Sequence, residues 1–175
     1  DQRTELILVE ELTIARPGYN FLLEESGVIE GPDKTHRFII DPLDGTTNFL
    51  HGIPHFAISI GLEREGQLVS AVIFNPVTDE MYVAEKGQGA YLNDKRLRVA
   101  ARKTLNTAVL ATGIPFLGRE GHEKFLKELE SVMAVSAGVR RFGSAALDLA
   151  YLAAGRYYAF WERGLKAWDM AAGIL

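Results

Sequence analysis

The sequence predicts one domain of mixed α and β structure, and three observations support this class. Short apolar runs separated by turn residues predict a series of strands over residues 38–112. Apolar residues with helical spacing follow in the last third of the chain. The chain has 175 residues, of which 47% are hydrophobic, and this is enough for the core of one domain.

The first half of the chain is expected to form one helix followed by strands. The helix covers Glu5 to Ala15 and stops at Pro17-Gly18, and a short apolar strand covers Phe38 to Asp41. An antiparallel run of strands is then expected at Phe56–Leu62, Leu68–Asn75, Glu80–Ala84 and Ala90–Leu92, followed by a strand at Arg96–Val99. Thr107–Thr112 is expected to form another strand. Asn93-Asp94 suits a tight hairpin turn within this run.

The second half is expected to be mainly helical. Glu123 to Met133 is amphipathic, and a helix over Leu147 to Ala154 follows Ser144 as a possible N-cap. Tyr157 to Trp161 is expected to return to a strand. The class is therefore mixed, with polar motifs placed where strands end.

The stretch FIIDPLDGTTNF carries the clearest chemistry of the sequence. Asp41 follows an apolar run, and Pro42 has no N–H group, so the strand is expected to stop there and bend. The bend can bring the carboxylates of Asp41 and Asp44 and the carbonyl of Leu43 to one place. Two such charges about 4 Å apart repel by about 4 kcal/mol at an effective dielectric near 20, so a cation is expected between them. Lys34 and Arg37 are candidates, but oxygen ligands without sulfur or nitrogen favour Mg²⁺, Mn²⁺ or Ca²⁺.

The residues after Asp44 suit an anion. Gly45 permits close approach, and the N–H groups of Gly45, Thr46 and Thr47 can form a cup for phosphate. The alternatives are an aspartate-capped turn and a structural calcium loop. The calcium loop does not fit the spacing, because its sixth position is Thr46 rather than glycine and its twelfth is Gly52 rather than glutamate.

Four motifs together resemble the inositol monophosphatase family. They are EES at Glu24–Ser26, DPLDGTTNF at Asp41–Phe49, GSAALDLAYLAAG at Gly143–Gly155 and WDMAAG at Trp168–Gly173. Alone, the first is typical of a solvated turn and the last of a helix start at Asp169. The resemblance implies a layered α/β/α/β/α sandwich of the sugar-phosphatase type with a largely antiparallel first sheet. It also implies a homodimer, and a single domain over residues 1–175 that is incomplete at both ends.

The resemblance further implies which residues hold metal. Glu25, Asp41 and the Leu43 carbonyl are expected to bind a first Mg²⁺, and Asp41, Asp44 and Asp169 a second. A third, weaker Mg²⁺ at Glu25 is expected in some family members. Mn²⁺ is a possible substitute and Li⁺ an expected inhibitor.

Catalytic and substrate roles follow from the same resemblance. Thr46 and Glu25 are expected to deprotonate a water molecule that attacks phosphorus. The residues expected to bind substrate are Asp44, Gly45, Thr46, Gly143, Ser144, Ala145, Glu162 and Asp169. A helix N-cap remains the alternative for Ser144 and a solvated charge for Glu162. Small residues after Asp169 are expected to let its helix lie close to the metals.

The expected function is that of a Mg²⁺-dependent phosphomonoesterase acting on inositol monophosphate or a similar small polyol or sugar phosphate. Fructose 1,6-bisphosphate, a 3′-phosphorylated nucleotide and histidinol phosphate are alternative substrates. A noncatalytic regulator that binds the transcription machinery is the alternative of another class. The formal charge of −4 leaves no basic face for nucleic acid, and no leader or apolar run of about 20 residues is found, so a cytoplasmic protein is expected.

Overall fold

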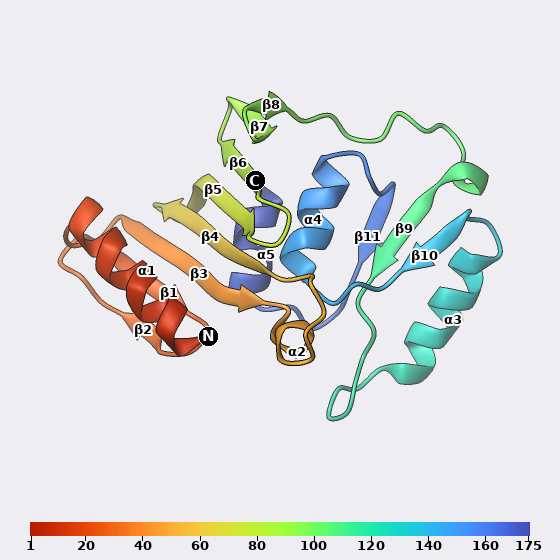
Figure 1. The fold of residues 1–175 in the computed structure, drawn as a ribbon, viewed down its shortest axis with the longest axis horizontal. Helices are drawn as coiled ribbons and strands as arrows, with labels where there is room; N and C mark the ends of the chain where they lie inside the picture. The colour runs from red at the N-terminus through yellow and green to blue at the C-terminus, as the bar shows by residue number, and fades with distance from the viewer.

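The computed structural model describes residues 1–175 and shows five layers (Figure 1). Helix α1 (Gln2–Ala15) covers one face of an eight-stranded sheet. Helices α4 (Ala145–Ala153) and α5 (Ala167–Ile174) lie between this sheet and a three-stranded sheet, and α3 (His122–Met133) covers the outer side of the small sheet. The layered α/β/α/β/α arrangement predicted from the sequence is confirmed.

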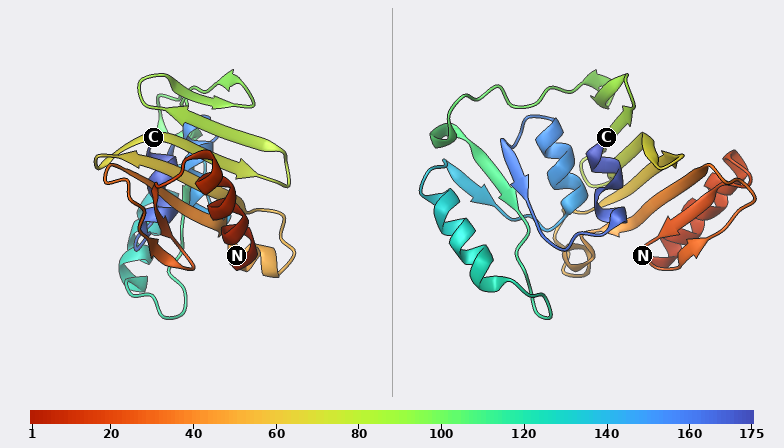
Figure 2. Two further views of the ribbon diagram at one scale, coloured as in Figure 1. Left: turned by 90° about the vertical axis from the view of Figure 1, so that its left-hand side faces the viewer. Right: turned by 180° about the vertical axis from the view of Figure 1, so that it is seen from behind.

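The large sheet is antiparallel except at one pair of neighbours. Its strand order is β2-β1-β3-β4-β5-β6-β7-β8, and only β1 and β3 run parallel. Figure 2 shows how these strands lie beside α1. The strands are β1 (Asn20–Leu23), β2 (Gly27–Ile29), β3 (His36–Asp44), β4 (Ala57–Arg64), β5 (Gln67–Asn75), β6 (Glu80–Glu85), β7 (Gly89–Leu92) and β8 (Lys95–Arg96).

The small sheet is parallel and contains β10 (Gly138–Arg140), β9 (Val109–Thr112) and β11 (Ala159–Trp161), in this order. A 3₁₀ turn at Leu105–Thr107 leads into β9. Strand β10 has only three residues and no alternating pattern, so the sequence did not predict it. None of the helices is long and apolar enough to cross a membrane.

Two further expectations are corrected. Strand β3 does not stop at Asp41 but continues through a bulge to Asp44, because the ladder resumes where Asp44 pairs with Ala57. The strand expected over Arg96–Val99 is reduced to Lys95–Arg96. The turn before it is confirmed, because Asn93 and Asp94 have φ angles of 43° and 66°.

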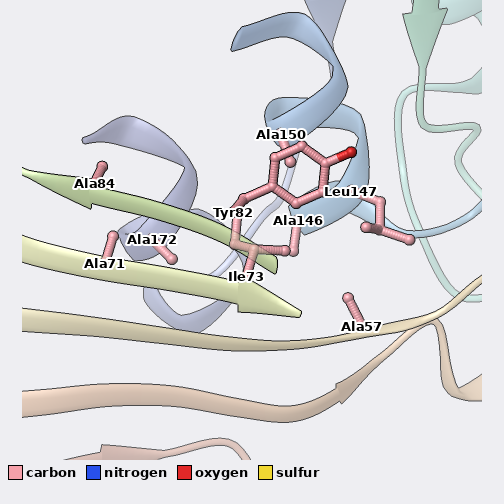
Figure 3. Packing of buried hydrophobic residues seen from close by; sticks show 9 residues of the cluster. All are labelled: Ala57, Ala71, Ile73, Tyr82, Ala84, Ala146, Leu147, Ala150 and Ala172. Carbon is pink, nitrogen blue, oxygen red and sulfur yellow. The ribbon is translucent and has the colours of Figure 1, made fainter. Parts of the chain in front are cut away.

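Two cores pack against opposite faces of the large sheet. The larger one joins the sheet to α4 and α5 and contains nine residues: Ala57, Ala71, Ile73, Tyr82, Ala84, Ala146, Leu147, Ala150 and Ala172 (Figure 3). The smaller one, beneath α1, contains Phe21, Leu23, Phe38 and Ile40. Strands of this sheet are thus buried on both sides, which explains their long apolar runs.

Helix α5 lies unusually close to its neighbours because the facing residues are small. A Cβ atom at Gly61 of β4 would lie 2.9 Å from the Cβ of Ala171, and one at Gly173 would lie 2.5 Å from the Cβ of Leu149 in α4. Small residues after Asp169 therefore allow the helix to pack closely against its neighbours. The surfaces that they approach are β4 and α4.

Substitution of Gly61 tests this contact. Gly61→Ala is expected to destabilise the fold by about 1–3 kcal/mol, because the new methyl group overlaps Ala171. Adding Ala171→Gly should recover part of the loss. The double variant should therefore lose less unfolding free energy than the sum of the losses of the two single variants. Urea unfolding of the four proteins gives the comparison. Additive losses would contradict the contact.

Candidate active site

The parallel pairing of β1 and β3 places Glu24 beside Asp41. Leu23 pairs with Ile40, and both face α1 in the smaller core. The Glu24 N–H donates to the Ile40 carbonyl at 3.3 Å, which extends the pairing by one residue. Because side chains alternate along a strand, Glu24 and Asp41 both face the other side, where α5 packs.

This register corrects the role expected of Glu25. The side chain of Glu25 is exposed, whereas that of Glu24 is partly buried and interacts with Asp41, Asp44 and Asp169. The N–H groups of Glu25 and Ser26 donate to the carboxylate of Glu5, each at 3.0 Å, and this holds the turn against α1. The structure therefore assigns the inward position to Glu24, one residue earlier than expected.

The bulge in β3 separates the two aspartates of DPLD. The Leu43 N–H donates to Asp41 Oδ1 at 2.9 Å across Pro42. Asp44 then turns toward α4, where its Oδ2 accepts hydrogen bonds from Ser144 Oγ at 2.5 Å and the Ala146 N–H at 2.7 Å. Strand β3 is thereby tied to the first turn of α4.

Gly45 and Thr46 form the next corner of the site. Gly45 has a φ angle of 95°, and a Cβ atom there would lie 3.0 Å from the His55 carbonyl, so both conformation and space require glycine. Thr46 begins the short helix α2 (Thr46–Leu50). Its hydroxyl lies 3.1 Å from the Leu43 carbonyl and 3.4 Å from Asp1 Oδ2.

Asp169 approaches from α5. It lies in the first turn and not at the N-cap, which was the alternative for this motif taken alone. Its carboxylate accepts the N–H of the capping residue Lys166 at 2.6 Å. Ser59 of β4 pairs with Asp41 of β3, and its hydroxyl group donates a hydrogen bond to the Trp168 carbonyl at 3.3 Å. The start of α5 is therefore attached next to Asp41.

Burial makes the ionised forms of these carboxylates unfavourable. It is the largest cause that raises the pKa of Asp41 to about 9, followed by the charges of Asp44 and Glu24. Burial also raises the pKa of Asp44 to about 6, against the hydrogen bonds from Ser144 and Ala146. The pKa values of Glu24 and Asp169 are raised for the same first reason.

The donor set suits a hard divalent cation. All its members are carboxylate, carbonyl or hydroxyl oxygens, and the Oε2 atom of Glu24 and the Oδ1 atom of Asp1 are buried without hydrogen-bond partners. Asp41, Asp44 and Asp169 each accept a backbone N–H, and no three acidic or histidine side chains have the spacing of a closed metal cluster. The residues fit Mg²⁺ by chemistry and burial.

A cleft of about 210 Å³ opens beside this cluster. Seven of the expected residues line it: Asp44, Gly45, Thr46, Gly143, Ala145, Glu162 and Asp169. Ser144 does not, because it is 1% exposed and lies behind Asp44, where it caps α4 through the Leu147 N–H. Its N-cap interpretation is thus confirmed.

Glu162 reaches the cleft by lying over a glycine. A Cβ atom at Gly113 would lie 1.9 Å from the Glu162 carboxyl carbon, so only glycine leaves space for this side chain. Burial, and then the charge of Asp44, raise the pKa of Glu162 to about 7. Glu162 is therefore half-buried beside the cluster and is not a solvated surface charge.

Sequence reasoning missed four other chemically distinctive residues of the cleft: Phe116, Arg119, Arg141 and Asp148. Phe116, Arg119 and Arg141 lie in loops, and no motif or periodic pattern in the sequence around them indicated a role in the site. Asp148 did give one, because it is the only charged residue within the otherwise apolar run AALDLAYLAA.

The arrangement joins strand ends that carry carboxylates to a turn rich in N–H donors, and these are the groups that bind metal ions and phosphate in proteins. The model of the inositol monophosphatase family matches residues 1–175, and the chain belongs to this family. It is 65% identical over 175 residues to an inositol-1-monophosphatase of Rhizobium meliloti (strain 1021), covering all of this chain and 66% of the relative.

Two further comparisons agree. The chain is 49% identical over 179 residues to the Nus factor SuhB of Pseudomonas aeruginosa, covering all of this chain and 66% of that protein. The crystal structure of extragenic suppressor protein suhB from Bartonella henselae superimposes with a TM-score of 0.98 at 59% identity, covering all of this chain and 68% of the other. The chain thus spans about two thirds of the length of these relatives.

The raised pKa values predict how stability depends on pH without metal. Asp41 and Asp44 bind protons more tightly in the folded protein than in the unfolded chain, so stability should fall as pH rises from about 4 to about 9. The midpoint of thermal unfolding in excess chelator measures this fall. Asp41→Asn should make the dependence shallower, and Mg²⁺ should stabilise wild type most at high pH. A wild-type slope equal to that of Asp41→Asn would contradict the assignment.

Proposed function

We propose that the protein is a Mg²⁺-dependent phosphomonoesterase that hydrolyses inositol monophosphate or a similar small polyol or sugar phosphate. The observation that carries this proposal is the convergence of four carboxylates from the ends of β1 and β3 and the start of α5 beside the Gly45-Thr46 turn. Family membership and the named inositol-1-monophosphatase relatives support the substrate class.

Two or three Mg²⁺ ions would be held by oxygen atoms of this cluster, and Mn²⁺ could replace them. The proposed ligands are Glu24, Asp41, the Leu43 carbonyl, Asp44 and Asp169, with Glu24 in the role expected of Glu25. When bound, such ions neutralise the carboxylates, polarise phosphate oxygens and make a water molecule more acidic. Without them, Asp41 retains its proton at neutral pH.

The remaining chemistry belongs to the chain's own groups. The N–H groups at Gly45 and Thr46 would hold the phosphate, since Gly45 keeps the backbone open to the cleft. The hydroxyl of Thr46, with the carboxylate of Glu24, would orient the attacking water and take up its proton. Glu162, Gly143 and Ala145 would contact the polyol on the far side of the phosphate from Thr46.

Metal dependence is the first test of this function. Excess chelator is expected to abolish phosphate release from myo-inositol 1-phosphate, and Mg²⁺ to restore it, because buried carboxylates cannot otherwise bind an anionic ester. Millimolar Li⁺ should inhibit, as the family resemblance implies. Release of inorganic phosphate from a small panel of phosphoesters is the measurement. Undiminished activity in chelator would exclude the proposed mechanism.

Adjacent glutamates provide a matched pair for the second test. Glu24→Gln should lower kcat by about a hundredfold or more, because it removes a charged group from the cluster. Glu25→Gln, which changes an exposed side chain, should retain activity within about a factor of three. The steady-state kinetics of both variants are compared with wild type. The reverse ranking would restore Glu25 to the role first expected of it.

A regulatory function is a second candidate, because several relatives are named Nus factor SuhB. Under this proposal the protein would bind the transcription machinery through a surface, independently of turnover. Asp44→Asn separates the two functions. Under either function, this variant should not release phosphate. If the protein acts as a regulator, the variant should still produce the regulatory effect in cells that lack the native protein. If the cellular effect disappears with turnover, catalysis is required.

A further inference from the structure

Asp148 is a buried carboxyl group at the edge of the proposed substrate cleft. It lies in the first turn of α4, where its N–H donates to the Ser144 carbonyl at 3.0 Å. The residue is only 1% exposed, yet it lines the same cleft as Asp44 and Glu162. Asp148 is therefore almost completely covered by protein and lies directly beneath the wall of the cleft.

The carboxyl group of Asp148 has no charged partner to neutralise it. Its Oδ1 atom is buried without a hydrogen-bond partner, and the ion pairs of the molecule do not include it. The charge of Arg141 acts on it from a distance, but burial and the charges of Glu162 and Asp44 outweigh that effect and raise its pKa to about 8. The nearby Tyr157 hydroxyl is also buried and unpartnered.

Such a group is costly for folding, because buried polar atoms without partners lose their hydration. The neighbours Leu147 and Ala150 are buried and apolar, so an apolar residue or an amide at position 148 would be easier to accommodate. Helix formation does not require the aspartate either, since Ser144 already caps α4. The carboxyl group is best explained by a ligand that supplies the missing hydrogen bond.

We infer that Asp148 is a specificity-determining residue that binds a hydroxyl group of the polyol part of the substrate, together with Glu162. This inference rests on the proposed phosphomonoesterase function. Glu162 comes from the end of β11 and Asp148 from the start of α4, so the two carboxyl groups reach one cleft from neighbouring elements. The hydroxyl groups of a polyol can donate hydrogen bonds to these two carboxyl groups. The aryl group of an aryl phosphate has no hydroxyl group that could do so.

Two substrates distinguish this role from general support of the site. For Asp148→Ala, kcat/KM for myo-inositol 1-phosphate should fall by about tenfold to a hundredfold, because the hydroxyl loses a buried partner. The value for 4-nitrophenyl phosphate should change by less than about threefold. Asp148→Asn, which retains an acceptor oxygen, should show a smaller loss with the polyol ester. The assays are made at saturating Mg²⁺.

Tyr157→Phe is the matched control. It removes the other buried, unpartnered oxygen near Asp148 without changing a residue of the cleft. Both substrates should react as in wild type. If Asp148 only supported Tyr157, the two variants would have the same effect, and the inference would be overturned.

The temperature of thermal unfolding distinguishes substrate binding from a structural role, because loss of a structural contact would lower this temperature. Because the unpartnered carboxyl group is costly, Asp148→Asn should unfold at the same or a higher temperature than wild type, although its kcat/KM for the polyol ester is moderately lower. Equal losses with both substrates, no loss with either, or a lower unfolding temperature with unchanged selectivity would each overturn the inference.

Failure of the proposed function would be recognised separately. If wild type releases no phosphate from any ester, the phosphomonoesterase proposal fails, and calorimetric binding still tests Asp148. In that case Asp148→Ala should bind myo-inositol 1-phosphate more weakly than wild type but inorganic phosphate equally well. Equal binding of the polyol ester by both proteins would overturn the inference.

Discussion

The repulsion between buried carboxylates at the ends of β1 and β3 is the constraint that the rest of the structure must accommodate. The parallel register places Glu24 beside Asp41 on the face where α5 packs, and there Asp41 is buried and Glu24 is partly buried. Ionised together in this setting, they would lower the stability of the fold. A bound cation would neutralise this repulsion. The capacity to bind a cation therefore follows from the pairing of β1 with β3.

The scaffold holds this unfavourable cluster by satisfying one oxygen of each aspartate. Asp41 accepts the Leu43 N–H across the bulge, Asp44 accepts two donors from the start of α4, and Asp169 accepts the N–H that precedes its own helix. Each bond also joins two elements or fixes a turn. The same interactions therefore orient the carboxylates and connect the large sheet to the helical layer between the sheets.

Stability and function compete at this cleft. Glu162 fits only because Gly113 has no side chain, and Asp148 remains buried without a partner in an otherwise apolar helix. Elsewhere in the same layer, small apolar residues such as Ala171 and Ala172 pack tightly. Two acidic side chains that burial makes unfavourable thus lie at the wall of the cleft, which is the pattern expected of a site shaped for a ligand.

The sequence by itself determined the mixed class, most strands of the meander and the chemistry of DPLDGTT, because these depend on local patterns and on residue types at fixed spacing. It did not determine that Glu24 rather than Glu25 faces Asp41, since a one-residue change of register between β1 and β3 exchanges the two faces of a strand. Strands β1 and β10 were missed because they are short and gain their stability from parallel partners far away in the chain. Asp148 and Glu162 meet only through the packing of α4 beside β11, and distant contacts of this kind leave no periodic pattern in the sequence.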